Sequence, residues 1–325
     1  MLMPKGKTKM NCLFVFAICP GRMTFGIFCL AVVKKFITER DASMEYITLN
    51  NGVKMPIIGY GVNKLEKEET ERCVLDALNA GYRLIDTAQS YGNEKEIGSA
   101  IKKSGVPREE IFLTTKVKIA NFGYEKTKAS VLSDLEKFGT DYIDLVLVHQ
   151  PFGDYFGSYK ALEDLYFEGK IKAIGISNFY AYKMVDMASF ARVKPAVNQV
   201  ELHPFDQRIE SKEWHDKYEV KMQAWAPLGQ ARVNMLELPE LREIARRYKK
   251  SVAQIILRWH IQRGISAIPG TPDPKFMKEN LDVFDFFLTE SDMERIKKLD
   301  RERSLFYSHT DPVTVEFFAK KAAEN

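Results

Sequence analysis

Residues 83–94 read Arg-Leu-Ile-Asp-Thr-Ala-Gln-Ser-Tyr-Gly-Asn-Glu, and this stretch decides the fold. Residues 83–85 predict a short buried strand that ends at Asp86, and a polar loop then presents Tyr91 before a helix begins. A carboxylate and a phenol at the mouth of a strand suggest a proton donor. Because tyrosine alone titrates near pH ~10, such a donor needs a nearby cation, and a carboxylate to hold that cation. We therefore expect a lysine and a histidine at the ends of neighbouring strands.

Predicted strands and helices alternate on both sides of this stretch. Residues 46–55, with Asn50-Asn51-Gly52 at their centre, predict a β-hairpin. Eight further strands are predicted at residues 56–62, 82–86, 111–116, 143–149, 171–176, 196–200, 220–225 and 265–268. Predicted helices follow them at residues 66–80, 94–103, 125–138, 161–168, 182–190, 207–218, 239–248, a segment capped by Ser251, and 273–281. This order predicts an α/β fold, a (β/α)₈ TIM barrel with the hairpin closing its bottom. We expect one domain over residues 44–325, with an irregular tail after Arg301.

Charge and cysteine content exclude several classes of protein. The 325-residue chain has a net charge of +4, but residues 1–43 hold seven Lys or Arg against two Asp or Glu. The rest of the chain therefore has 41 basic and 42 acidic residues, which gives no basis for nucleic-acid binding. Cys73 is the single cysteine beyond residue 43, and no CxxC pair occurs. A reducing compartment, and so a cytoplasmic protein, is expected.

The N-terminal stretch has two interpretations. Residues 12–33 are mostly apolar and long enough for a membrane anchor. Pro20, Gly21 and Arg22 interrupt the stretch, however, and an arginine at mid-bilayer is costly. We expect Met44 to be the true start and residues 1–43 to be a mis-assigned extension. In that case no membrane partner is expected, and the alternative is a protein anchored through residues 12–33.

Ionisable residues lie at the predicted ends of three consecutive strands: Asp86, Lys116 and His149. In a barrel the active site is formed at these strand ends. We expect Tyr91 to protonate a carbonyl oxygen, Lys116 to lower the pKa of Tyr91, and Asp86 to hold Lys116. His149 would orient the carbonyl group of the substrate. Since no side chain supplies hydride, this chemistry calls for a nicotinamide cofactor.

Further strand ends supply candidate cofactor contacts. Trp225 can stack on a nicotinamide ring, and Ser177, Asn178 and Gln199 can bind its carboxamide. No GxGxxG follows a strand, so a Rossmann site is not expected. Besides His149, we expect Asn63 and Phe152 to line the substrate pocket. Because the loop after His149 and the C-terminal tail are both short, that pocket should be open.

Several spaced motifs carry a family resemblance. They are Leu84-Ile85-Asp86-Thr87-Ala88, Tyr91-Gly92-Asn93-Glu94, Thr115-Lys116, Leu147-Val148-His149-Gln150-Pro151, Gly175-Ile176-Ser177-Asn178-Phe179 and Asn198-Gln199. Over residues 46–307 the sequence resembles the aldo-keto reductase superfamily, in particular bacterial enzymes similar to 2,5-diketo-D-gluconate reductases. The resemblance implies NAD(P)H-dependent reduction of a small carbonyl compound by an Asp86, Tyr91, Lys116 and His149 tetrad. Residues 224–229 are similar to the family's nicotinamide-stacking strand and pyrophosphate loop, which implies cofactor contacts by Trp225, Ala226 and Leu228.

The resemblance is weaker at the adenosine end of the cofactor. Similar enzymes carry Lys-Ser and a later Arg that hold the 2′-phosphate of NADPH, where this chain has Gly270, Thr271 and Phe276. Thr271 and Lys275 remain candidate phosphate contacts, and Asn280 matches the family's adenine-binding asparagine. We expect NADPH, with NADH or dual use as the alternative.

Two other functions stay open from the sequence. Lys116 is also a candidate Schiff-base lysine of a barrel aldolase. The chain is also compatible with a non-catalytic, cofactor-binding regulatory barrel. The remaining histidines have no ligand-like spacing, so no metal site is expected. The expected assembly is a monomer or a weak oligomer.

Overall fold

Eight parallel strands lie at the centre of the computed structural model, which describes residues 44–324. The predicted extension of residues 1–43 lies outside the described residues. The strands pair in chain order, so each one neighbours the next. They are β3 (Tyr60–Gly61), β4 (Leu84–Asp86), β5 (Phe112–Val117), β6 (Leu145–Val148), β7 (Ile174–Ser177), β8 (Val197–Glu201), β9 (Lys221–Trp225) and β10 (Ser266–Ala267).

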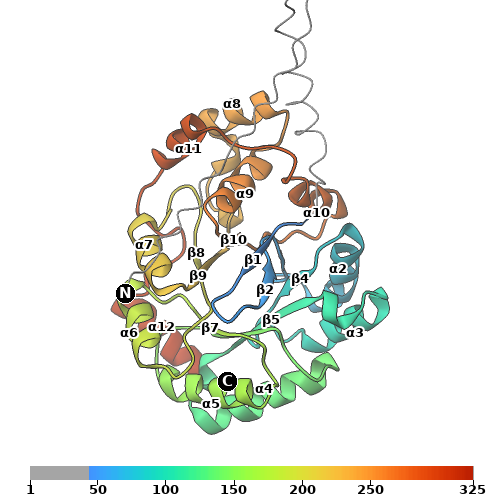
Figure 1. Cartoon of the computed structure of the whole chain (residues 1–325), viewed down its shortest axis with the longest axis vertical. Coiled ribbons are helices and arrows are strands. Elements are labelled where there is room, and N and C mark those ends of the chain that lie inside the picture. Colours follow the sequence, from blue (N-terminus) through green and yellow to red (C-terminus); the bar gives the residue numbers. More distant parts are fainter. Residues whose placement is uncertain (1–43, 325) are drawn as a thin grey trace, which may run out of the picture. The chain divides into compact units, whose positions relative to one another are not determined.

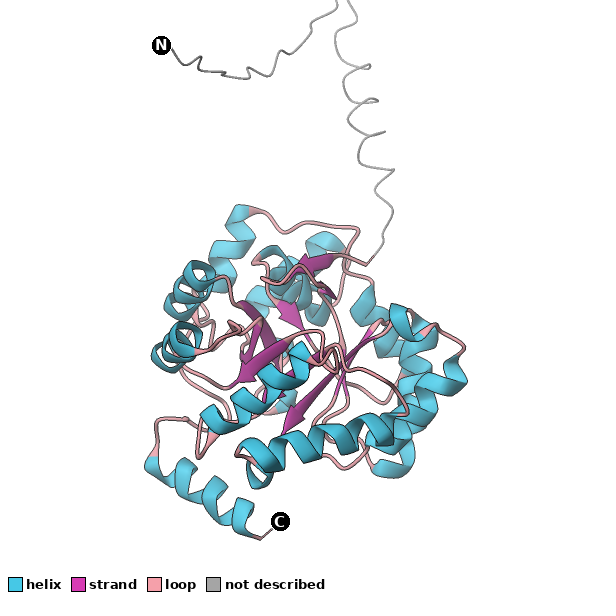
Figure 2. Cartoon of the chain, turned by 60° about the horizontal axis from the view of Figure 1, so that its bottom comes forward, coloured by secondary structure: helices cyan, strands magenta, loops and turns pink. Residues whose placement is uncertain are grey.

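The sheet closes on itself beside its two terminal strands. Ile58 forms a parallel bridge to Ala267. The amide of Gly59 donates to the carbonyl of Ala267 over 2.9 Å, and the amide of Ala267 donates to Ile57, also over 2.9 Å. Helices surround the strands (Figures 1 and 2). The predicted (β/α)₈ barrel is therefore confirmed.

Each barrel strand is followed by at least one helix. The helices are α2 (Lys67–Ala80), α3 (Glu94–Ser104), α4 (Tyr124–Phe138), α5 (Tyr155–Phe167), α6 (Ala181–Phe190), α7 (Ile209–Tyr218), α8 (Pro239–Tyr248), α9 (Val252–Gln262), α10 (Pro274–Leu281), α11 (Glu290–Lys297) and α12 (Pro312–Ala323). Local signals set their ends. Gly81, at φ 110°, ends α2, and the reciprocal bonds of Ser251 and Gln254 begin α9, as predicted.

The hairpin lies at the N-terminal end of the barrel. Strands β1 (Tyr46–Thr48) and β2 (Lys54–Pro56) pair antiparallel. At the turn, Asn50 donates to the carbonyl of Pro195 and Asn51 to that of Lys172. Those carbonyls precede β8 and β7, so the turn crosses the ends of the strands opposite to the active-site ends. The expected hairpin at the barrel bottom is confirmed.

Several boundaries differ from the expectations, and helix α11 was not predicted. Helix α5 begins near residue 155 rather than 161, because Asp154 caps it by accepting from the amide of Gly157. The prediction of an irregular tail after Arg301 is wrong for residues 312–323, which form α12. Asp311 caps that helix and Pro312 occupies its first turn.

The described residues contain neither a membrane-spanning helix nor a cluster of metal ligands. No helix within residues 44–324 has both the length and the apolar character needed to cross a bilayer. In the same part of the chain, no three His, Cys, Asp or Glu side chains gather closely enough to hold a metal ion.

Candidate active site

Two predicted site residues form a buried ion pair on adjacent strands. Asp86 ends β4, and Lys116 lies in β5. The Lys116 ammonium donates to Asp86 Oδ1 over 2.5 Å and to the carbonyl of Thr87 over 2.8 Å. Both side chains are almost fully buried, with 1% and 2% of their surfaces exposed. Parallel pairing of β4 with β5 brings them together, because the C-terminal ends of both strands lie at the same end of the barrel.

Tyr91 and His149 complete the cluster. His149 follows β6, and its ring meets that of Tyr91 edge to face, with 6.3 Å between the ring centroids. The Lys116 ammonium lies 5.6 Å from the centroid of the Tyr91 ring. The four residues of the predicted tetrad, which are 63 positions apart at most in the chain, are therefore grouped at one end of the barrel.

Burial opposes ionisation of the central pair. It raises the pKa of the Asp86 carboxyl and lowers the pKa of Lys116, while the attraction between the two groups acts against both shifts. The amide of Gln199 also donates to Asp86 Oδ2 over 2.7 Å. Each partner thus has further hydrogen bonds that favour its charged form, and we assign the pair as ionised.

Tyr91 and His149 are both shifted toward their neutral forms. Burial raises the pKa of the Tyr91 phenol well above its ordinary value, and the charge of Asp86 adds to that effect. This direction is opposite to the expected lowering by Lys116, because burial of the phenol is the largest effect and the charge of Asp86 acts in the same direction. Burial, assisted by the charge of Lys116, lowers the pKa of His149 to about 3. The Tyr91 phenol is therefore protonated and His149 is neutral at physiological pH.

The predicted nicotinamide contacts connect to the tetrad through hydrogen bonds. Asn178 has a φ of 67°, in the left-handed region. Its amide nitrogen donates to the carbonyl of His149 over 3.0 Å, and its Oδ1 accepts from the Trp225 indole over 2.8 Å. The Ser177 hydroxyl donates to the carbonyl of Gln199 over 2.8 Å. These bonds fix the orientation of Trp225, whose ring is only partly buried although it lies at the end of β9.

A cavity of about 510 Å³ opens above the tetrad. Most of the residues predicted from sequence to bind cofactor or substrate line it. They are Asn63, Asp86, Tyr91, His149, Ser177, Asn178, Gln199, Trp225, Ala226, Leu228 and Thr271. The lining thus includes three residues of the tetrad and Thr271, as a long dinucleotide requires, and it contains the partly buried indole of Trp225. These features fit a bound nicotinamide cofactor.

Some predicted site residues lie outside the cavity lining. Phe152 stacks on His309, with 5.8 Å between the ring centroids. Lys275 lies in α10 with its ammonium 5.7 Å from the ring of Phe276. Asn280 is buried on the same helix, where it hydrogen-bonds Tyr82. Lys116 lies behind the lining, and it contacts the cavity only through its partners.

Sequence reasoning missed part of the lining. Gln150, Arg232, Phe306 and Tyr307 also border the cavity. The C-terminal tail contributes Phe306 and Tyr307 to this lining, which the sequence did not predict. The position of Gln150 directly after His149 was a usable signal. Nothing local in the sequence indicates where Phe306 and Tyr307 lie.

Comparisons with known proteins agree with this geometry. A model of the aldo/keto reductase family matches residues 51–301. The uncharacterized oxidoreductase YtbE of Bacillus subtilis is 46% identical over 259 residues, which is 78% of this chain and 92% of that protein. Glyoxal reductase of the same species is 43% identical over 263 residues, covering 79% of this chain and 94% of that protein.

Solved structures show the same similarity. The aldo-keto reductase MGS-M4, from a deep-sea metagenome library of the Medee basin, is 41% identical with a TM-score of 0.80. That match covers 82% of this chain and 98% of the other. An aldo-keto reductase of Bombyx mori in complex with NADP is 29% identical with a TM-score of 0.78, and the match covers 82% and 95% of the two chains.

Proposed function

The chain belongs to the aldo/keto reductase family, and we propose that Asp86, Tyr91, Lys116 and His149 are its catalytic residues. It is an oxidoreductase that reduces aldehydes or ketones to alcohols with a nicotinamide cofactor. The observation that carries the assignment of roles is the buried Lys116–Asp86 pair beside Tyr91 and His149 at the base of the cavity.

In the proposed mechanism Tyr91 donates its hydroxyl proton to the carbonyl oxygen of the substrate. Its raised pKa keeps the proton in place until negative charge develops on that oxygen. Lys116, held by Asp86, then stabilises the phenolate that remains. Neutral His149 donates a hydrogen bond to the same oxygen and orients it. A bound nicotinamide supplies the hydride, and Trp225, Ser177, Asn178 and Gln199 would hold its ring.

Neither alternative function has comparable support. A Schiff-base lysine needs a free amine, whereas the Lys116 ammonium is buried and bonded to Asp86 and Thr87. A regulatory barrel would need no proton donor, yet Tyr91 lines the cavity.

For the cofactor we propose NADPH, with NADH also accepted. Thr271 lines the cavity, and Lys275 lies on α10, the helix that begins shortly after it. Those groups would contact a 2′-phosphate more weakly than the Lys and Arg of similar enzymes. Weak phosphate contacts reduce the advantage of NADPH over NADH.

We also propose that residues 44–325 form one catalytic domain that acts as a monomer or weak oligomer. The four proposed catalytic residues and the predicted nicotinamide contacts all belong to this domain, which supports treating it as the catalytic unit. If a chain that starts at Met44 has the same turnover as the full chain, a domain boundary at residue 44 is supported.

The decisive test of the mechanism is Tyr91→Phe in the full chain. Consumption of NADPH and of NADH is followed with a panel of aromatic aldehydes, α-dicarbonyls and aldoses. We expect turnover to fall to background, because the phenyl ring carries no proton to donate. The Kd for the cofactor, measured by quenching of protein fluorescence, should stay near that of the wild type. Retained turnover would refute Tyr91 as the acid.

A further inference from the structure

Residues 304–309, which we call the strap, form an aromatic wall on one side of the cavity. Phe306 and Tyr307 line the cavity, and both belong to the strap. The ring of Phe306 meets the indole of Trp225 edge to face, with 4.9 Å between the ring centroids. The wall thus contacts the tryptophan that we assign to the nicotinamide.

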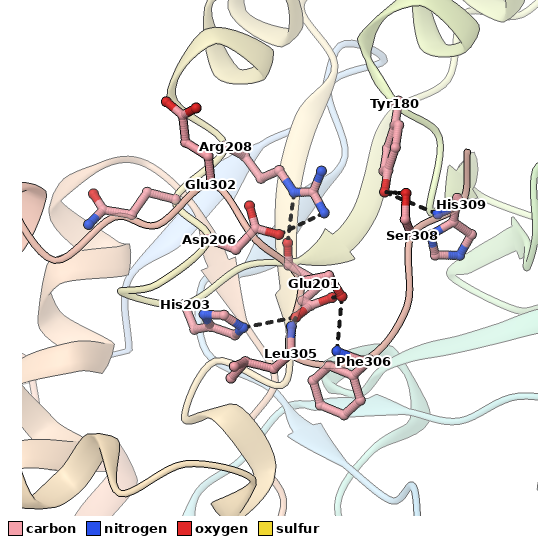
Figure 3. A network of polar contacts seen from close by, with 12 residues as sticks. Tyr180, Glu201, His203, Asp206, Arg208, Glu302, Leu305, Phe306, Ser308 and His309 are labelled. Atoms are coloured by element: carbon pink, nitrogen blue, oxygen red, sulfur yellow. Dashed lines mark hydrogen bonds and ion pairs between the residues drawn. The ribbon is translucent and has the colours of Figure 1, made fainter. Parts of the chain in front are cut away.

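A single buried carboxylate holds the start of the strap. Glu201 ends β8 with only 3% of its surface exposed. Its Oε1 accepts from the amide of Leu305 over 2.7 Å, and its Oε2 accepts from the hydroxyl of Ser304 over 2.5 Å. The Nε2 of buried His203 lies 2.9 Å from Oε1 (Figure 3). Glu201 therefore links the barrel wall directly to the strap.

Ser304 connects the Glu201 carboxylate to the two aromatic residues of the strap through hydrogen bonds. Its hydroxyl oxygen accepts from the amides of Phe306 and Tyr307, each over 2.9 Å. Because the same hydroxyl donates to Glu201, the carboxylate fixes the turn that presents both rings to the cavity. Bonds that use a charged acceptor are stronger than bonds between neutral groups.

A second anchor holds the end of the strap. The amide of His309 donates to the hydroxyl of Tyr180 over 3.1 Å (Figure 3). His309 Nε2 lies 2.9 Å from Oε1 of Gln150, which also borders the cavity. With this end held separately, loss of the Glu201 contacts would loosen the aromatic turn without releasing the whole strap.

We propose that Glu201 is a positioning residue for substrate selection, and that the wall it fixes favours carbonyl compounds with a flat aromatic group. The inference rests on the proposed reductase function. Glu201 touches none of the four catalytic residues in the hydrogen bonds of the described chain, so it acts through the strap. A small α-ketoaldehyde reaches Tyr91 and His149 without the wall, whereas an aromatic one gains ring contacts from it.

The test uses a matched pair of substrates, phenylglyoxal and methylglyoxal, which differ only in phenyl against methyl. In the full chain, Glu201→Gln and Ser304→Ala should each lower the ratio of kcat/KM for phenylglyoxal to that for methylglyoxal by about five- to ten-fold. The change should come from KM for phenylglyoxal. The Ser304→Thr variant keeps the hydroxyl group, so its ratio should stay at the wild-type value.

Glu163→Gln is the matched control. Glu163 is also buried and also accepts from a backbone amide, that of Val193, and it is further paired with Arg192. It lies on α5, outside the cavity lining. The Glu163→Gln substitution should leave the ratio of kcat/KM for phenylglyoxal to that for methylglyoxal unchanged. An unchanged ratio in both strap variants, or an equal fall in the control, overturns the proposal. If Glu201→Gln fails to fold, Ser304→Ala decides alone, since it removes no buried charge.

The two proposals fail in different ways. A wild-type enzyme that reduces no carbonyl compound refutes the reductase function and the strap together. An active enzyme whose strap variants keep the wild-type ratio refutes only the role of Glu201.

Discussion

We propose that Gly270 and Phe276 lie where the cofactor phosphate would bind, and the two positions differ in the side chains that they tolerate. A Cβ atom built on Gly270 would lie 2.3 Å from the backbone carbonyl oxygen of Gly61, beside the closure of the sheet. Phe276 is 46% exposed on α10. A side chain can therefore be exchanged at position 276, but any side chain at 270 forces the backbone apart.

Phe276→Arg should tighten NADPH binding by about five-fold and leave NADH binding within two-fold, because only NADPH offers a phosphate to the guanidinium. Gly270→Lys should instead lower the Tm and weaken both cofactors. Fluorescence titrations and thermal unfolding check the two variants. Equal tightening of NADPH and NADH in Phe276→Arg would reject the placement of the phosphate at this helix.

For single residues, the sequence indicated which side chains form the candidate site but not the direction in which the pKa of Tyr91 is shifted. Asp86, Lys116 and His149 could be found because parallel strands bring their C-terminal ends to one end of the barrel. The direction of the Tyr91 pKa shift could not be found, because burial and the Asp86 contact of Lys116 exist only in the folded chain.

Among the elements, helices α3 and α4 approach each other at Gly98. A Cβ atom on Gly98 would lie 2.5 Å from the carbonyl oxygen of Phe138, the last residue of α4. Glycine is ordinarily unfavourable inside a helix. Here its lack of a side chain lets the two helices pack without displacing backbone.

Gly98→Ala should therefore reduce the free energy of unfolding by about 2 kcal/mol, since overpacking outweighs the gain in helix propensity. Urea unfolding followed by circular dichroism measures the change. Lys95→Ala, at an exposed position of the same helix, should change stability by less than about 0.5 kcal/mol. Stabilisation by Gly98→Ala would show that the helices can move apart at little cost.

The strands and helices that were predicted correctly have recognisable signals within their own sequences. The alternating pattern predicted the eight strands, and the Ser251–Gln254 pair predicted the start of α9. Helices α11 and α12 and the strap were missed because they follow the last strand–helix unit of the barrel, where no repeating pattern constrains the chain. The strap is positioned by Glu201, which precedes Leu305 by 104 residues, so its contacts are tertiary.

For the whole molecule, buried histidines set the response to acid. Burial lowers the pKa of His149 to about 3 and that of His309 to about 4, and it also lowers the pKa values of His215 and His260. Below pH ~6.5 the unfolded chain binds protons that the folded chain does not, so stability falls as the pH falls. Asp134 and Asp206 act in the opposite direction, because burial raises the pKa of each to about 6.

Replacing His149 should weaken this dependence. In His149→Gln, the loss of stability between pH ~6 and pH ~4 should be smaller than in the wild type by about 1.4 kcal/mol per pH unit. Urea unfolding at several pH values gives the slope of the free energy of unfolding against pH for each protein. Comparing the two slopes removes any effect of the substitution that does not depend on pH. Parallel slopes would mean that His149 is protonated in the folded protein at these pH values.

The strap also has a consequence for biosynthesis. Its residues follow every strand of the barrel in the chain, so the ribosome adds the proposed wall after the four proposed catalytic residues. A polypeptide released before Ser304 would contain all four catalytic residues but not Phe306 and Tyr307. On the proposed role of the strap, substitutions confined to it would change the preference among substrates while leaving the four proposed catalytic residues unchanged.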